Sequence, residues 1–352
     1  MRRIYRVVFI VATAVSMARM PAAADDDRMT VEQQSRAEAR YLSNIRQVTN
    51  QAMGLTAAGE AYFSPDGNMI IFQAYPEGKS EYQIYTLDLK TQKLNMVSTG
   101  KGACTCAYFH PNGKRIVFSS THLDPHADDT RDNAKGGGYT WFFHEYMDVF
   151  EADVDGSHLK RLTTTPGYDA EATYSPDGRH IVFTSMRDGD QEIYLMNADG
   201  SRPRRLTYGK GYDGGAFFSP DGRRILYRGD RRNDGKMNLQ IRMIDADGDN
   251  DRAITDNHIF NWCPFWHPSG KSLIFTQVDH EAWSKGHAPN YDLFMMTPDG
   301  KYLTRITYDH QFDGLPVFSP DGARIMWTSK RGPLEESQIF IADFRLPEPF
   351  RP

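Results

Sequence analysis

The sequence predicts an all-β fold, a six-bladed β-propeller with four strands in each blade. Three observations predict it. One turn motif occurs six times, alternating strands and a hairpin surround most copies, and a single unpaired strand precedes the first copy. A repeat period in the range of about 40 to 50 residues is typical of propeller blades.

The turn motif is Ser-Pro-Asp-Gly or a close variant, and its copies begin at Ser64, His110, Ser175, Ser219, His267 and Ser319. These starts are 46, 65, 44, 48 and 52 residues apart. Proline presets φ, aspartate or asparagine accepts local hydrogen bonds, and glycine completes a type I turn. The motif therefore predicts a tight turn between the first and second strands of each blade.

The segments around each turn have the pattern of β-strands. The first strand lies before the turn, as residues 216–218 do before Ser219. The second and third strands follow the turn, as residues 179–184 and 191–196 do after Ser175, and they alternate apolar and polar side chains. An Asp-Gly pair such as Asp199-Gly200 then predicts a hairpin. A short strand that ends in Leu-Thr or Ile-Thr completes the blade.

The first and last repeats complement one another. The sixth repeat ends near Phe344 without a fourth strand, and residues 45–49 form an unpaired copy of that strand ahead of the first repeat. We therefore expect residues 45–49 to complete the last blade. Closing the ring in this way removes the exposed edges that invite aggregation.

The sequence divides into four segments. Residues 1–24 have a basic start, an apolar core and an Ala-rich cleavage site near Ala24, which is typical of a secretory signal. We expect a short helical segment in residues 25–44, the propeller in 45–346 with an insertion at about 120–145 in blade two, and a tail in 347–352. These features predict a periplasmic or secreted protein with no membrane insertion once the signal is cleaved.

Charge narrows the classes of partner. Without residues 1–24 the chain has 37 basic and 46 acidic residues, a net charge of −9. Such a surface argues against nucleic acid or anionic lipid as the main partner. The three cysteines, Cys104, Cys106 and Cys263, are too few for a disulfide framework. We expect either small buried thiols or, for Cys106 and Cys263 on opposite blades, a soft-metal site.

The repeat resembles that of TolB-like propellers. It reads Phe-Ser-Pro-Asp-Gly, then Ile-Tyr-x-Met-x-Ala-Asp-Gly, then Arg-Leu-Thr, and the resemblance covers about residues 45–344. It implies a six-bladed propeller with WD40-like (PD40) repeats and a partner protein in the cell envelope. We expect the protein to be a monomer. Only about 20 residues separate the signal from the ring, so we expect the N-terminal domain of TolB to be missing. Similar propellers accompany peptidase domains and occur in polysaccharide lyases, so the fold alone does not give the function.

Two faces of the predicted ring differ in character. The Ser-Pro turns and Asp-Gly hairpins share one face, whereas the long, individual loops lie on the other and hold most of the histidines and three tryptophans, among them Trp141 and Trp262. Loops that vary on a repeating scaffold usually carry function. The insertion supplies Trp141, His144 and Glu145, and we expect its aromatic end to pack over the mouth of the ring.

The inner strands predict a ring of polar residues. Six residues before each turn stand Ala58, Cys104, Asp169, Asp213, Asn261 and Asp313, and four before stand Glu60, Cys106, Glu171, Gly215, Cys263 and Leu315. Regular alternation places both sets toward the central channel. Asp169, Asp213 and Asp313 would then hold Ca²⁺ or another divalent cation, or bind the basic end of a peptide. The alternative is that these aspartates cap local turns.

No well-marked catalytic motif is present. The chain has no Gly-x-Ser-x-Gly elbow, no His-Glu-x-x-His helix and no phosphate-binding loop. A lyase or glycoside hydrolase needs no such motif, and His122, His144 or His310 would be its base.

We therefore expect a non-catalytic propeller that binds an envelope protein or peptide through the loop face. The predicted ligand-binding residues are Trp141, Glu145, Asp169, Glu171, Asp213, Asn261, Trp262 and Asp313. The alternative is a polysaccharide-active enzyme that uses a cation and His or carboxylate side chains at the channel mouth.

Overall fold

The repeated turn is closed by its own side chains. In the first copy the Ser64 hydroxyl donates to Asp66 Oδ1 at 2.6 Å and accepts the Met69 backbone N–H at 2.9 Å. Gly67 ends the turn with a φ of 69°, a left-handed conformation that favours glycine. The copies at Ser175, Ser219 and Ser319 repeat the serine–aspartate bond.

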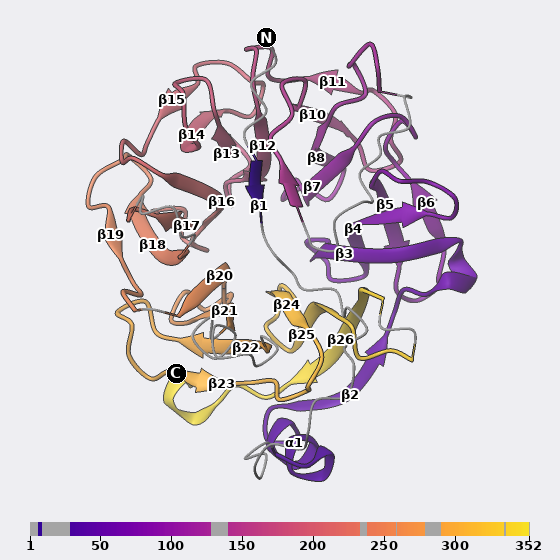
Figure 1. Ribbon diagram of the computed structural model, residues 1–352, viewed down its shortest axis with the longest axis vertical. Helices are drawn as coiled ribbons and strands as arrows, with labels where there is room; N and C mark the ends of the chain where they lie inside the picture. Colours follow the sequence, from indigo (N-terminus) through magenta and orange to yellow (C-terminus); the bar gives the residue numbers. More distant parts are fainter. Residues whose placement is uncertain are drawn as a thin grey trace, which may run out of the picture.

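A computed structural model describes residues 6–8, 29–127, 140–232, 238–257, 259–278, 290–333 and 336–351. It contains six four-stranded antiparallel sheets that surround a common axis (Figure 1). The predicted six-bladed β-propeller is therefore confirmed.

The strands of the blades are as follows. Blade one contains β3 (Leu55–Phe63), β4 (Met69–Pro76), β5 (Gln83–Asp88) and β6 (Leu94–Met96). Blade two contains β7 (Cys104–Phe109), β8 (Arg115–Ser120), β10 (Asp148–Asp153) and β11 (Lys160–Arg161). Blade three contains β12 (Asp169–Tyr174), β13 (His180–Ser185), β14 (Glu192–Asn197) and β15 (Arg204–Arg205). Blade four contains β16 (Tyr212–Phe218), β17 (Arg224–Asp230), β18 (Gln240–Asp245) and β19 (Arg252–Ala253). Blade five contains β20 (Phe260–Trp266), β21 (Leu273–Val278), β22 (Tyr291–Met296) and β23 (Thr304–Arg305). Blade six contains β24 (Asp313–Phe318), β25 (Arg324–Ser329), β26 (Gln338–Phe344) and β2 (Leu42–Gln47).

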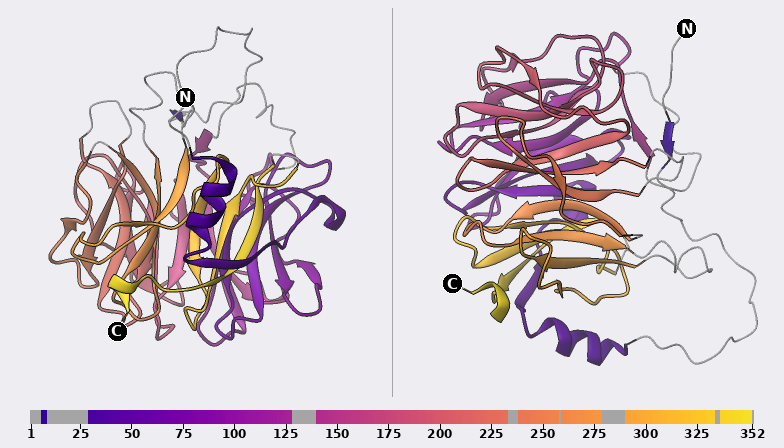
Figure 2. Two further views of the ribbon diagram at one scale, coloured as in Figure 1. Left: turned by 90° about the horizontal axis from the view of Figure 1, so that it is seen from below. Right: turned by 90° about the vertical axis from the view of Figure 1, so that its left-hand side faces the viewer.

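Antiparallel order gives the ring two distinct faces. The Ser-Pro turns and the Asp-Gly hairpins lie on one face, which we call the turn face. The connections between second and third strands, and those between blades, lie on the other, which we call the loop face. Figure 2 shows the ring edge-on, with the helix α1 (Val31–Glu38) outside it.

Each blade packs an aromatic side chain from its second strand against its neighbours. These side chains are at most 1% exposed: Phe72, Phe118, Phe183, Tyr227, Phe275 and Trp327. Burial of one aromatic side chain stabilises a fold by roughly 1.5 to 3 kcal/mol. The core therefore lies between the blades, and the inner strands are left to surround the axis.

The N-terminal strand closes the ring. β2 pairs antiparallel with β26, with Leu42 opposite Phe344 and Gln47 opposite Phe340. The strand begins three residues earlier than the predicted segment 45–49 and ends two residues before its limit. Blade six thus takes its outer strand from the start of the chain.

A hydroxyl after the fourth strand locks every blade. In all six blades this hydroxyl accepts a hydrogen bond of 2.9 Å from a backbone N–H of the third strand. The hydroxyls belong to Thr49, Ser98, Thr163, Thr207, Thr255 and Thr307. This bond explains the Leu-Thr and Ile-Thr endings of the repeat. Thr49 supplies it to blade six, where it also donates to Gln338 Oε1 at 2.7 Å.

Replacement of Thr49 by valine is expected to lower the free energy of unfolding by about 1 to 3 kcal/mol, because it leaves the buried Ile339 N–H and the Gln338 amide oxygen without the Thr49 hydroxyl. Denaturant unfolding measures the change. Thr56→Val is the matched control, since Thr56 is exposed on β3, and it should change stability by less than about 0.5 kcal/mol. Equal effects of the two substitutions would contradict this account of ring closure.

The remaining elements lie outside the blades. They are α1, the 3-10 helices Gln51–Met53 and Glu348–Phe350, and a two-stranded pair of β1 (Arg6–Val8) and β9 (Thr140–Phe142). β1 lies within the predicted secretory signal, so β9 would lose this partner on cleavage. Within the described residues, no helix is both long and apolar enough to cross a membrane.

Candidate site at the propeller axis

Every inner strand has the same irregularity. Each has a break in its pairing register, and the residue four before the turn has a φ between 48° and 60° in all six blades: Glu60, Cys106, Glu171, Gly215, Cys263 and Leu315. These breaks are β-bulges, which re-aim side chains next to the bulge. The predicted alternation assumed regular strands and did not include them.

At Glu60, Cys106 and Leu315 the bulge binds its blade to the one before it. The backbone N–H of Glu60 donates to Thr328 Oγ1 at 3.1 Å, that of Cys106 to Gln73 Oε1 at 3.0 Å, and that of Leu315 to Thr276 Oγ1 at 3.1 Å. Each acceptor belongs to the second strand of the preceding blade. This bond stabilises the left-handed conformation at three positions that are not glycine.

The bulge residues and one arginine form a group around the axis, which we call the axial cluster: Glu60, Cys106, Glu171, Arg228 and Cys263. Both thiols are at most 8% exposed and neither forms a disulfide. Burial raises the pKa of both thiols well above the ordinary value. They are therefore protonated at neutral pH and are neither nucleophiles nor thiolate ligands in this state.

Glu171 and Arg228 form a buried ion pair at the centre of this cluster. Arg228 also donates to the Tyr212 hydroxyl at 2.8 Å, and Glu171 Oε2 accepts from the Thr184 hydroxyl at 2.7 Å and the Gly215 N–H at 2.8 Å. A Cβ on Gly215 would lie 1.7 Å from the Arg228 guanidinium. Glycine at this position thus makes room for the arginine, and the pair is structural.

Glu60 differs from the other carboxylates of the inner strands. It is partly exposed, and its hydrogen bonds come from the Tyr62 hydroxyl at 3.3 Å and the Cys106 thiol at 3.6 Å. Burial, together with the negative charge of Glu171, raises the pKa of Glu60 to about 7. Glu60 is therefore the axial group that changes charge near neutral pH.

Substitution of Glu60 by glutamine is expected to change the pH dependence of stability. The folded state holds the Glu60 proton up to about pH 7, whereas the unfolded chain loses it near 4.5. Wild-type stability should therefore fall as pH rises from 4.5 to 7 relative to Glu60→Gln, by about 1 to 3 kcal/mol in total. Thermal melts of both proteins across this range measure it. The exposed Glu77→Gln is the control, and a constant difference between wild type and Glu60→Gln would contradict the prediction.

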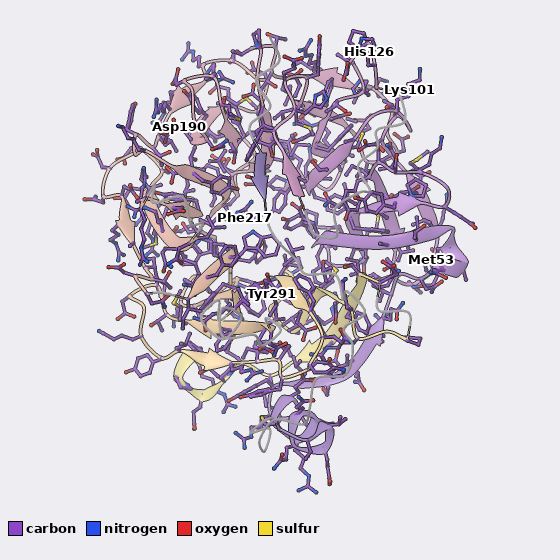
Figure 3. The ribbon with its side chains drawn as sticks, in the orientation of Figure 1. Met53, Lys101, His126, Asp190, Phe217 and Tyr291 are labelled. Carbon is purple, nitrogen blue, oxygen red and sulfur yellow. The ribbon has the colours of Figure 1, made fainter. Side chains whose placement is uncertain are left out.

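Aromatic rings close the axis on the side of the turn face. Tyr62, Tyr108, Phe217 and Phe265 stand two residues before their turns, and their ring centroids are 5.1 to 6.2 Å apart. Figure 3 shows Phe217 near the middle of the ring. A ligand that reaches the axial cluster would therefore have to approach from the loop face.

The structure does not place Asp169, Asp213 and Asp313 together. Each is at most 1% exposed and pairs with an arginine of its own blade, namely Arg187 at 3.0 Å, Arg231 at 2.9 Å and Arg331. Burial raises the pKa of Asp169 and of Asp213. Each aspartate therefore has an arginine partner within its own blade.

Asn261 is enclosed where blades four and five meet. It is 0% exposed, and its amide donates to the side chains of Gln240 and Asn257 and to the Ile259 carbonyl at 2.8 to 3.1 Å. Within the described part of the chain, no three His, Cys, Asp or Glu side chains are grouped as a metal site. The described residues thus do not bring Asp169, Asp213 and Asp313 together, and the cation shared by these three aspartates stays a prediction.

His144 joins the two ends of the insertion. Its Nε2 lies 3.3 Å from Asp124 Oδ2, and its Nδ1 accepts the Tyr146 backbone N–H at 3.1 Å. Both ring nitrogens are engaged, so neither has a lone pair for proton abstraction. In this structure His144, one of the predicted general bases, makes structural contacts with both ring nitrogens.

The other two candidate bases lie apart from the axis. His122 Nδ1 is 2.8 Å from the Ser120 hydroxyl, which in turn lies 3.1 Å from Cys104 Sγ, and burial lowers the His122 pKa. His310 is 65% exposed beside Asp309. His122 and His144 lie in the same insertion of blade two, whereas His310 lies in the connection between blades five and six, so the three histidines do not come from one connection.

The aromatic end of the insertion packs beside the mouth of the ring. Phe143 contacts Tyr168 with ring centroids 5.0 Å apart and also packs on the apolar cluster that contains Tyr212 and Phe260. Trp262 is half-buried in the same cluster. Glu145 is exposed, and its carbonyl accepts the Gly167 N–H at 3.2 Å. The side chain of Trp141 lies outside the described residues.

Sequence reasoning missed the arginines. Arg187, Arg231 and Arg331 each stand 18 residues after the aspartate that they pair with. The constant spacing in three repeats was the available signal. Arg228 has no counterpart in the other blades, and only the glycine opposite it hints at its position.

Comparisons with known proteins agree with this architecture. The family described as Tricorn protease N-terminal beta propeller domain matches residues 138–291. The Protein TolB homolog of Chlorobium chlorochromatii is 29% identical over 146 residues, which cover 41% of this chain and 27% of the relative. The match thus spans about a quarter of that relative's length.

Two solved structures share the fold. A protein assigned as TolB from Agrobacterium tumefaciens is 22% identical with a TM-score of 0.57, over 82% of this chain and 91% of that protein. Oligogalacturonate lyase from Vibrio parahaemolyticus is 15% identical with a TM-score of 0.53, over 84% of this chain and 79% of the lyase. At these identities the likeness concerns the fold alone.

Proposed function

Since the chain is a TolB-like six-bladed β-propeller, we propose that it is an exported, non-catalytic binding protein of the cell envelope. Its partner is a protein or peptide, which it binds through the loop face around the axis. The relatives named TolB support a periplasmic location for this role.

One observation carries this proposal: the predicted aspartates and His144 already make contacts that hold the fold together. Asp169, Asp213 and Asp313 are paired with arginines, and both nitrogens of His144 are engaged. General acid–base catalysis needs a group with an available proton or lone pair at the substrate. A surface of varied loops on a rigid ring needs neither and suits recognition.

Two exposed tyrosines test which face binds. Tyr208 is 75% exposed in a connection of the loop face, and Tyr302 is 63% exposed in a hairpin of the turn face. Both are replaced by asparagine, and envelope extract is passed over the immobilised proteins to capture the partner. The proposal expects Tyr208→Asn to weaken capture and Tyr302→Asn to leave it unchanged. If Tyr302→Asn loses partner capture and Tyr208→Asn retains it, the proposal is contradicted.

Glu60 supports a second candidate, a polysaccharide lyase or glycoside hydrolase. A carboxyl group with a pKa of about 7 beside the Tyr62 hydroxyl has the properties of a general acid or base. Release of unsaturated or reducing products from acidic polysaccharides is the test, with Glu60→Gln as the control. If the wild type cleaves such a polysaccharide and Glu60→Gln does not, the enzyme replaces the binding proposal. If the wild type cleaves none of them, a lyase or hydrolase of acidic polysaccharides is excluded.

A further inference from the structure

Three blades repeat one arrangement on the loop face. In blades three, four and six an aspartate is the first or second residue of the inner strand, an arginine follows 18 residues later, and a threonine stands six residues earlier. The aspartate and arginine pair in each blade. Because the connections have equal length, the three sites can be compared position by position.

Blade six shows the arrangement with a carboxylate bound to it. Arg331 donates to both oxygens of Glu38, at 2.8 Å and 2.7 Å, and the Tyr308 backbone N–H donates to Glu38 Oε1 at 2.7 Å. Glu38 comes from α1, a separate element that packs on this blade. The aspartate–arginine pair therefore binds a second carboxylate with a guanidinium fork and a backbone N–H.

Blade four supplies a second carboxylate to its arginine from within the blade. Arg231 contacts Asp213 at 2.9 Å and a second carboxylate, Asp251, at 3.2 Å. Asp251 belongs to the connection before the outer strand of the same blade. This arginine thus also has two carboxylates.

Blade three lacks the second carboxylate. Arg187 donates from Nη2 to Asp169 at 3.0 Å and from Nε to the Ser185 hydroxyl at 2.8 Å. Within the described part of the chain, no other carboxylate lies within ion-pair distance of it, and Asp188 pairs with Arg205 at 3.4 Å. Thr164 corresponds to Tyr308, and among the described residues its backbone N–H has no hydrogen-bond acceptor.

The guanidinium of Arg187 is held ready for a ligand. It lies 5.3 Å from the centroid of the Phe183 ring and 4.8 Å from that of Tyr194, and its side chain is 13% exposed. Such packing fixes the fork before binding and lowers the entropy lost on association. Beside it, Phe143 and Met186 pack against Tyr168 and Met147, which places apolar surface next to the charge.

We propose that Arg187 and the Thr164 backbone N–H bind a carboxylate of a protein partner, an acidic side chain flanked by an apolar one, as Arg331 and Tyr308 bind Glu38. The occupant is a peptide segment because blade six is filled by a glutamate on a short helix. This inference rests on the proposed function and names the chemistry of the partner.

Fluorescence polarisation with labelled peptides tests the site. One set carries a single Glu beside a Phe in a Gly/Ser background, and the matched set carries Gln in place of Glu. The wild type is expected to prefer the Glu peptides by about tenfold, the value of one charge-assisted bidentate contact. The preference should disappear in Arg187→Gln and decrease with salt.

Two further variants keep the test decisive. Asp169→Asn combined with Arg187→Gln removes both charges, so that no buried carboxylate is left unpaired, and thermal melts check that it folds. Arg179→Gln, 81% exposed on the turn face, should keep the preference. Absence of the preference in the wild type, or its survival in the double variant, would overturn the proposal.

Two other outcomes separate this proposal from neighbouring ones. If the wild type binds oligogalacturonate but not the Glu peptides, and the double variant loses that binding, the carboxylate belongs to a sugar and the assignment to a protein partner is overturned. If Tyr208→Asn abolishes partner capture and the double variant captures normally, the binding function stands and the role of Arg187 is overturned.

Discussion

Replacement of Arg228 by methionine is expected to lower the free energy of unfolding by about 3 to 5 kcal/mol, because it leaves the Glu171 carboxylate buried without its cation. Arg228 is 4% exposed and Glu171 is 6% exposed. Burial opposes the charge on Arg228, but the carboxylate of Glu171 raises its pKa well above the ordinary value. Denaturant unfolding of the two proteins measures the loss.

The double variant Glu171→Gln with Arg228→Met should recover much of this loss, since a buried charge is no longer left alone. Arg179→Met is the matched control, because its side chain is 81% exposed, and it should change stability by less than about 0.5 kcal/mol. A loss of under about 1 kcal/mol for Arg228→Met would mean that the axial ion pair does not hold the blades together.

Arg331→Met should destabilise the protein by a similar amount, about 3 to 5 kcal/mol, since it leaves two buried carboxylates, Glu38 and Asp313, without a cation. It should also release α1, whose docking depends on Glu38. Unfolding measurements report the first effect, and limited proteolysis of the segment before β2 reports the second.

Arg36→Met controls for a change of charge on α1. Arg36 pairs only with Glu32 in the described structure, and both side chains are more than 70% exposed, so this variant should behave as the wild type does. Glu38→Gln should release the helix with a smaller loss of stability, because Arg331 retains Asp313. Unchanged proteolysis in Arg331→Met would contradict the docking role of the pair.

Much of the fold could be predicted because it depends on local hydrogen bonds that recur in each repeat. The Ser-Pro-Asp-Gly turns, the Asp-Gly hairpins and the Leu-Thr endings each make their bonds within a few residues or within one blade. The closing strand could be predicted by counting, since the last repeat lacked one. Its bounds were less certain because β2 follows the pairing of β26 and not a motif of its own.

The site was harder to predict because it depends on features that sequence periodicity does not contain. A bulge at Glu60, Glu171 and their counterparts breaks the alternation on which the predicted ring of aspartates depended. The aspartates are neutralised by arginines that lie a whole strand away in sequence. The Asp–Arg spacing was visible, but its meaning depends on the pairing of the two inner strands.

Hydrogen exchange on the complex with the captured partner tests the central claim, recognition through the loop face, most directly. The proposal predicts slowed exchange in the connections of the loop face, at residues 164–168, 208–211 and 308–312, and no change in the Ser-Pro turns and Asp-Gly hairpins. Protection confined to the turn face, with the loop connections exchanging as in the free protein, would contradict it.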